Sequence, residues 1–178
     1  MTGFLRFVGI MNAAIWLGTA FFFTFAAQPA SLSVDMRAVL GANSSLYFLG
    51  AISGVVMSRY YHVMLACAVV ALLHFLAEWL YMGRPRRKFS FGLVAALFIL
   101  TLIGSNAVYP SLVSLNRKHY TPTVSVAERE AAGKSFRALS VVGIALNVLI
   151  IGGLVIYVSR VSSPSDVVRF NRPVQFRG

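Results

Sequence analysis

The sequence predicts an all-α integral membrane protein: a four-transmembrane-helix bundle with an interfacial or re-entrant helix before the second span. Of its 178 residues, 58% are hydrophobic and 12% are charged, and the mean hydropathy is +0.76. Charged residues make up roughly a quarter of an average soluble chain. The apolar residues come in blocks of about 20, the length that crosses a hydrocarbon core of about 30 Å. We therefore expect one membrane domain over residues 1–160 and no separate soluble domain.

The first apolar block predicts a span over residues 7–27. Although Arg6 precedes it, the block is too long for the apolar core of a secretory signal peptide, so we expect a helix of the protein. Pro29 ends it, because proline lacks an N–H donor and disfavours a helical conformation in the residue before it. The segment 46–57 is short, moderately apolar and rich in glycine and serine, and Arg59 follows it. Because an arginine deep in a membrane is costly, we expect the interfacial or re-entrant helix here.

Three further apolar blocks complete the predicted bundle. They predict the second, third and fourth spans over residues 60–82, 89–109 and 138–159. Pro110 ends the third span for the same reason as Pro29 ends the first. The polar residues 111–135 then form a connection, and residues 161–178, with two prolines and three arginines but no periodicity, form an irregular basic tail.

The distribution of charge predicts the surroundings and the orientation. The net charge of +11 comes from 16 Lys and Arg against 5 Asp and Glu, and the basic residues flank the apolar blocks. This placement indicates contact with anionic lipid headgroups, not with nucleic acid, because no basic–aromatic surface of a nucleic-acid module is present. Arg84–Lys88 is the densest basic cluster. Since Lys and Arg concentrate in cytoplasmic loops, we expect this turn and both termini to be cytoplasmic, in a bacterial inner membrane.

A weak internal repeat is visible in the sequence. Pro29 and Pro110 each follow a span and lie 81 positions apart, and Arg59 and Arg137 each precede a span and lie 78 positions apart. Two parallel two-span halves would explain both spacings, and repeats in membrane proteins often place a site at their interface. The alternative is that two spans running outward need similar stop signals.

One face of the second span carries side chains that could bind a metal. Helical positions three and four apart share a face, and this face carries Met57, Met64, Cys67, Ala71, His74 and Glu78. Met, Cys and His are ligands that suit copper(I), so the candidate metal residues are Met64, Cys67, His74 and Glu78. The alternative is that Met and Cys fill gaps in a helix interface, while His74 and Glu78, one turn apart, bond to each other.

Two other kinds of site receive less support. Glu78 is a candidate proton or cation site, because a carboxylate within a span needs an explanation, but an ion pair with Arg84 or Arg86 is the simpler account. A haem needs two facing ligands, whereas His62 and His74 lie on one helix, about 18 Å apart at 1.5 Å per residue.

Cys67 is the only cysteine, which excludes an intrachain disulfide. No cofactor is predicted.

Asn12, Asn106 and Asn147 are polar groups inside the first, third and fourth spans. We expect them to form hydrogen bonds between helices, each contributing about 1 kcal/mol or less. The alternative is that they line a shared polar pocket. The sequence contains no HExxH, P-loop or paired-carboxylate motif and no nucleophile–base set. We therefore expect a protein that is not an enzyme.

Several short motifs resemble a known family. The first span reads Asn12-x-x-x-Trp16-x-Gly18-x-x-Phe21-Phe22, with Pro29 after it. It resembles the opening span of the transmembrane-protein-205-like family (domain of unknown function 4149), which is related to copper-resistance D-type membrane domains. The step Arg59-Tyr60-Tyr61 is similar to an aromatic–basic step of the same family. The resemblance implies a four-helix integral membrane bundle with no established catalytic activity.

The fourth span also resembles this family, with two departures. It reads Phe136-x-x-Leu139-Ser140-x-x-Gly143-x-x-x-Asn147, where the family has the pattern F-x-x-L-H-x-x-S-x-x-x-N. Ser140 therefore stands in place of a histidine, and Gly143 in place of a serine. These are the positions most able to bind a metal, so the resemblance does not carry a copper role over to this chain.

Two functional hypotheses follow. The first is a small non-catalytic membrane protein, an accessory or structural subunit that packs against other subunits of a larger membrane complex; small residues in the spans and few charges favour it. The second is a transporter or a copper-type metal-handling protein that uses the face of the second span. It requires that face to point into the bundle, near Asn12, Asn106 or Asn147.

Overall fold

The computed structural model describes residues 2–41, 45–82 and 88–162, and over these residues it is helical with short turns and contains no strand. In chain order, with η for a π-helical turn, the elements are α1 Thr2–Phe22, η1 Phe23–Ala27, α2 Gln28–Ser31, α3 Val34–Leu40, α4 Ser45–Met82, α5 Lys88–Ile103, η2 Gly104–Val108, α6 Tyr109–Tyr120 and α7 Val126–Ser162. The predicted tail lies almost wholly outside the described residues, as does the turn at 83–87.

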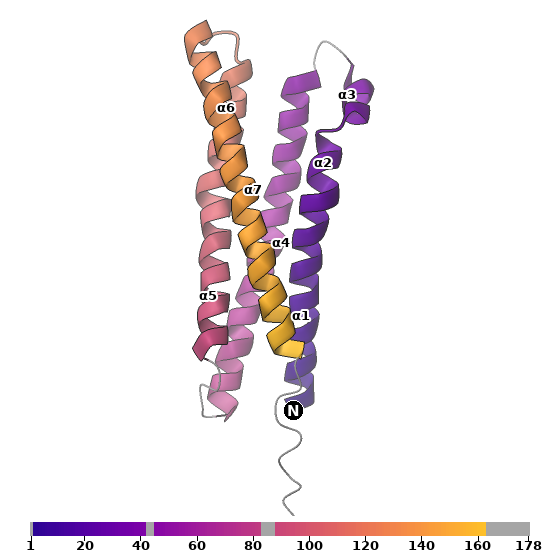
Figure 1. Cartoon of the computed structure of the whole chain (residues 1–178), viewed down its shortest axis with the longest axis vertical. Coiled ribbons are helices and arrows are strands. Elements are labelled where there is room, and N and C mark those ends of the chain that lie inside the picture. The colour runs from indigo at the N-terminus through magenta and orange to yellow at the C-terminus, as the bar shows by residue number, and fades with distance from the viewer. Residues whose placement is uncertain (1, 42–44, 83–87, 163–178) are drawn as a thin grey trace, which may run out of the picture.

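Four long rods lie side by side (Figure 1): α1 with η1 and α2, then α4, then α5 with η2 and α6, and finally α7. The end that holds the start of α1 is called the N-terminal end below, and the end that holds α3 and the α6–α7 turn is called the hairpin end. Within the described residues, four segments are long and apolar enough to cross a membrane, namely Phe7–Ser31, Leu46–Ala77, Phe89–Tyr120 and Val126–Ser162. The predicted all-α fold with four spans is therefore confirmed.

The second rod differs from the prediction, because residues 46–57 do not form a separate helix. They are the first part of α4, which continues without a break to Met82. Glycine in this part lets neighbouring helices come close: a side chain at Gly50 would lie 2.4 Å from the amide of Asn116. Arg59 is exposed, so the continuous helix does not bury its charge within the bundle. The short helix that precedes α4 is instead α3, which Ser33 caps by accepting a hydrogen bond from the Met36 N–H at 3.1 Å.

The two prolines that were expected to end spans lie inside the rods. Pro29 and Pro110 are each the second residue of an α-helix that directly follows a π-helical turn. In these turns the N–H of Gln28 donates to the Phe23 carbonyl and the N–H of Tyr109 donates to the Gly104 carbonyl. The wider turn accommodates a residue that cannot donate and whose ring clashes with the preceding turn. The prediction that the third helix ends before Pro110 is wrong, since α6 continues to Tyr120.

The π-helical turns support the internal repeat. They begin at Phe23 and Gly104, which are 81 positions apart, the spacing already found between Pro29 and Pro110. The rods that contain them run in the same direction, and α4 and α7 run in the other (Figure 1). Each of α1 and α5 packs against both α4 and α7. This arrangement is the one expected for two parallel two-span halves.

The polar segment between the third and fourth spans forms a helical hairpin instead of a loose connection. The Ser125 hydroxyl accepts from the Glu128 N–H at 3.3 Å and donates to the Glu128 carboxylate at 3.0 Å, so Ser125 caps the start of α7 at Val126. The α7 helix then runs for 37 residues to Ser162. It lies obliquely across the bundle, from α6 at the hairpin end to α1 at the N-terminal end (Figure 1).

The best-packed part of the core lies toward the N-terminal end of the bundle. Trp16 of α1 and Tyr157 of α7 are fully buried there and meet edge to face with their ring centroids 6.1 Å apart. Small residues of α1 and α4 allow these helices to approach each other, and they include Ala13, Ala20, Ala68 and Ala71. Toward the hairpin end the rods enclose a hollow.

Candidate functional site

Two adjacent tyrosines of α4 contact both π-helical turns. The ring of Tyr60 stacks on Phe23 of η1, with the centroids 4.0 Å apart and an interplanar angle of 10°. The ring of Tyr61 lies against Gly104 of η2, where a Cβ atom would be only 2.5 Å from the ring. The absence of a side chain at Gly104 therefore makes room for Tyr61. The adjacent residues Tyr60 and Tyr61 of α4 thus contact η1 and η2 respectively, the two turns that are 81 positions apart.

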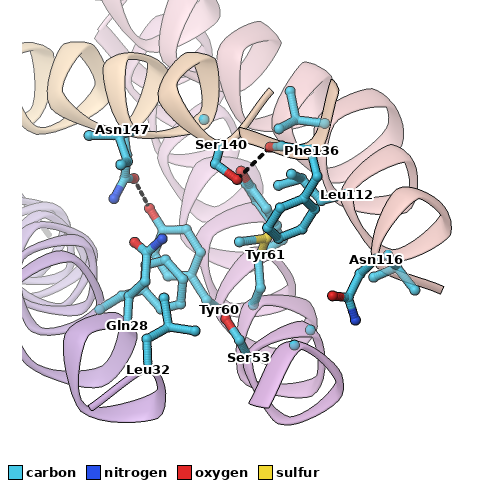
Figure 2. A pocket seen from close by; sticks show the side chains of 18 residues that line it. Gln28, Leu32, Ser53, Tyr60, Tyr61, Leu112, Asn116, Phe136, Ser140 and Asn147 are labelled. Carbon is cyan, nitrogen blue, oxygen red and sulfur yellow. Dashed lines mark hydrogen bonds between the residues drawn. The ribbon is translucent and has the colours of Figure 1, made fainter. Parts of the chain in front are cut away.

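A chain of buried and partly buried hydrogen bonds connects three helical rods next to these rings. The Tyr60 hydroxyl donates to Oδ1 of Asn147 on α7 (Figure 2). The Asn147 amide in turn donates to the Thr24 hydroxyl on η1, and that hydroxyl donates to the Ala20 carbonyl at 2.7 Å. Each of these polar groups thus has a partner, as buried polar groups normally do.

A cavity of about 180 Å³ opens beside this chain, between α2, α4, α6 and α7. Its lining is neutral: aromatic, aliphatic and glycine residues form most of the wall, and the remaining side chains are uncharged polar groups. The polar lining residues, apart from Tyr60 and Tyr61, are Gln28, Ser53, Asn116, Ser140 and Asn147. Figure 2 shows them around the hollow, with the Ser140 hydroxyl bonded to the Phe136 carbonyl.

Three of these polar side chains have no hydrogen-bond partner among the residues that the structure describes. Asn116 is 9% exposed, and its amide lies against Gly50 and points toward the hollow (Figure 2). Gln28 and Ser53 are half-buried and reach the cavity from α2 and α4. The cavity therefore offers three uncharged groups, from three helices, that could bond to a molecule within it.

The predicted metal-binding face of the second span points into the bundle. Met64, Cys67 and His74 are all buried, and Met64 is completely so. The side chain of Glu78 lies outside the described part of the structure. His74 Nε2 lies 2.7 Å from the Leu5 carbonyl oxygen, and the Asn12 amide donates to the Cys67 carbonyl at 2.9 Å. These bonds join α4 to α1.

The same side chains do not gather around one point. Met64 and His74 are ten residues apart on one helix, which corresponds to about 15 Å. Among the described residues, no group of three or more His, Cys, Asp or Glu side chains is placed to hold a metal ion. Met64, Cys67 and His74 thus form a buried row along α4, and they do not converge on a single metal centre.

The three predicted asparagines lie in different surroundings. Asn12 and Asn147 are buried and form the hydrogen bonds between helices described above. Asn106 lies in the middle of η2, is exposed and makes no side-chain hydrogen bond among the described residues. Only Asn147 of the three lines the cavity.

Sequence reasoning missed most of the cavity. The sequence places Asn116 beyond the predicted end of the third span at Pro110, and Ser53 in the predicted interfacial or re-entrant helix, so neither is predicted to line a site. One signal was present: Tyr60, Phe136, Ser140, Gly143 and Asn147 belong to the motifs that carry the family resemblance, and all of them line the cavity.

Comparison with known protein families shows a match over most of the chain. The family described as Domain of unknown function (DUF4149) matches residues 11–121, which include most of α1 and all of α4, α5 and α6. The cavity residues on α7 lie beyond the matched part. No curated protein and no solved structure matches the chain.

Proposed function

The chain belongs to the DUF4149 family, a domain of unknown function, and from that premise we propose that it is a non-catalytic membrane protein that acts as an accessory subunit. In this role it packs against a larger protein complex within the membrane. The proposal rests on the outer surface of α7, which offers another helix a better fit than it offers lipid.

The supporting observation is a row of small residues along the exposed side of α7. Every seventh position carries a small side chain, and each is exposed: Ala131, Ala138, Ala145, Gly152 and Ser159. Exposed branched residues lie beside them, among them Val141, Val142, Val148, Leu149, Val155 and Ile156. We call these residues together the α7 seam. Small residues allow helices to approach closely in membranes, and a seven-residue period is typical of helices that pack along their whole length.

The burial of the four rods points to the same helix. Within the apolar window of each rod, 17% of residues are buried for α7, compared with 28% to 39% for the other three. The α7 helix is therefore the rod that its own chain covers least, and a partner helix seated on the seam would bury it.

Photo-crosslinking in native membranes tests the proposal. A crosslinking amino acid at position 145, in the α7 seam, is expected to capture a partner chain in a fixed ratio, and the Gly152→Leu substitution should weaken that capture. Gly92→Leu is the matched control, because Gly92 is also exposed and a side chain there meets nothing within 4 Å. If position 145 crosslinks only to lipid and the purified chain is a lone monomer, the proposal fails.

A second candidate function is metal handling, and the buried row of Met64, Cys67 and His74 favours it. Copper(I) could pass along such soft side chains one site at a time. In this case the purified protein binds copper(I), and replacing Met64 with Leu and Cys67 with Ser abolishes the binding. Equal copper content in this double variant and in the unmodified protein would exclude the row as the path.

We also propose that the N-terminal end of the bundle faces the cytoplasm of a bacterial cell, with anionic lipid headgroups around its basic residues. The α4 helix ends and α5 begins at that end, and the sequence between them carries the basic cluster at 84–88.

A further inference from the structure

We propose that the cavity between α2, α4, α6 and α7 binds an uncharged, membrane-soluble molecule with a ring-sized, oxygen-bearing head, such as a lipid-soluble quinone. The inference does not depend on the α7 seam, because it concerns the interior of the bundle and not its outer surface.

The lining determines the charge of the ligand. None of the 18 residues that line the cavity is Lys, Arg, Asp, Glu or His. A charged group in such a cavity would lose its hydration without gaining a counter-charge. An ion or a charged lipid headgroup is therefore disfavoured, and a neutral molecule is favoured.

The unsatisfied polar groups determine the chemistry of its head. Asn116 is nine-tenths buried and has no hydrogen-bond partner within the described part of the chain. The half-buried side chains of Gln28 and Ser53 also have no partner there. Buried polar groups in folded proteins almost always have partners. In the neighbouring Tyr60–Asn147–Thr24 chain every side chain finds a hydrogen-bond partner within the protein, so polar groups beside the cavity can be paired without a ligand. Amides and hydroxyls can all donate, so carbonyl oxygens of a ligand fit them.

The walls and the volume favour a ring. Tyr60, Tyr61 and Phe136 present aromatic side chains to the cavity, and aromatic surfaces pack well against flat rings. The volume of about 180 Å³ slightly exceeds the roughly 150 Å³ of an engineered protein cavity that binds benzene. One substituted six-membered ring therefore fits, while its apolar tail would remain outside.

The position of the cavity suits a ligand that arrives from the membrane. Leu32 and Ile144 both line it and are 47% and 49% exposed, so they lie at its rim. The exposed Arg59 and Arg137 are sequence neighbours of the lining residues Tyr60 and Phe136. Arginines of this kind mark the edge of the hydrocarbon region. The cavity thus lies near that edge, where the polar head of an amphiphile resides and its tail can stay in lipid.

A binding experiment with the full-length protein tests the proposal. The protein is placed in nanodiscs of phosphatidylcholine and titrated with a decyl-substituted benzoquinone, and bound quinone is measured against empty nanodiscs. We expect saturable binding at one site per chain. Asn116→Leu removes the buried donor and Gly143→Leu fills the cavity, so each should weaken binding by about tenfold or more. Gly92→Leu, on the outer surface of α5, should leave the affinity unchanged.

The controls separate this ligand from others. Thermal unfolding checks that each variant folds. If Asn116→Leu proves unstable, Ser53→Ala is the smaller change that replaces it, and it should also weaken quinone binding. Monoacylglycerol and a fatty-acid anion are titrated in parallel, and neither should saturate the site. Three results would overturn the proposal: uptake equal to that of empty nanodiscs, which is expected if water alone fills the cavity; unchanged affinity in the variants; or saturable binding of the monoacylglycerol without binding of the quinone.

Discussion

At the scale of single residues, two asparagines with the same predicted role have different surroundings. The Asn147 amide accepts a hydrogen bond from the Tyr60 hydroxyl and donates one to the Thr24 hydroxyl, so it joins α7 to α4 and η1. Asn106 is exposed in η2 and makes no side-chain bond within the part of the chain that is described. Both residues interrupt apolar runs in the sequence. The difference arises from the side of its helix that each one occupies: Asn147 is buried on α7, whereas Asn106 is exposed in η2.

This difference gives the first prediction. Asn147→Leu leaves the Tyr60 and Thr24 hydroxyls without their partner, so it should lower the free energy of unfolding by about 1 kcal/mol, the magnitude of hydrogen bonds between membrane helices. Asn106→Leu is the matched control and should not destabilise the protein. Unfolding in mixed micelles with increasing dodecyl sulfate measures both. A Tyr60→Phe substitution added to Asn147→Leu should cost little more, since the bond is already lost; additive losses would show that the two residues do not act together.

At the scale of the helices, the apolar blocks predict the number of rods well and their ends poorly. Each block became a long helix, because hydrophobicity over about 20 residues dominates the choice of structure in a membrane. The errors fall at prolines and glycines. Pro110 does not end its rod, because the π-helical turn η2 accommodates a residue that cannot donate a hydrogen bond. Gly50 does not end α4, and the lack of a side chain there leaves room for the Asn116 amide. Such compensation comes from neighbouring turns and helices, and no local pattern reveals it.

The same reason explains why the cavity could not be derived from the sequence. Asn147 can be recognised because it interrupts an apolar run, and Tyr60 because it follows Arg59 at a step that resembles the family's. Asn116 and Ser53 lie in mixed polar segments, where one more polar residue carries no signal. Only the continuation of α4 and α6 toward the hairpin end brings these two side chains to one hollow.

The contact between η2 and α4 gives the second prediction. Gly104→Ala would place a Cβ atom 2.5 Å from the Tyr61 ring, so the ring or the turn must shift. Overpacking of this kind costs about 1–3 kcal/mol. Gly92→Ala should instead stabilise the protein by about 0.5–1 kcal/mol, because alanine is the better helix former and nothing lies within 4 Å. Unfolding in the same mixed micelles compares them, and equal stabilities of the two variants would contradict the close packing of Tyr61 on η2.

At the scale of the whole molecule, the two halves of the chain build one bundle with two different ends. The N-terminal end holds the tightly packed Trp16–Tyr157 core, and the hairpin end holds the cavity, the polar end of α6 and the charged start of α7. The α7 helix is about 55 Å long at 1.5 Å per residue, well beyond the roughly 30 Å of a hydrocarbon core. One end of the bundle must therefore project into water, and the charged first turns of α7 identify it as the hairpin end.

This asymmetry makes the orientation testable. In a Cys67→Ser background, single cysteines are introduced at Thr123, in the α6–α7 turn, and at Ser162, at the other end of α7. The basic cluster at 84–88 should hold the N-terminal end in the cytoplasm. A maleimide that cannot cross membranes should therefore label position 123 in bacterial spheroplasts that express the chain, and label position 162 only after the membrane is permeabilised. Labelling of position 162 from outside would reverse the orientation, and it would place the mouth of the cavity on the cytoplasmic side of the bilayer.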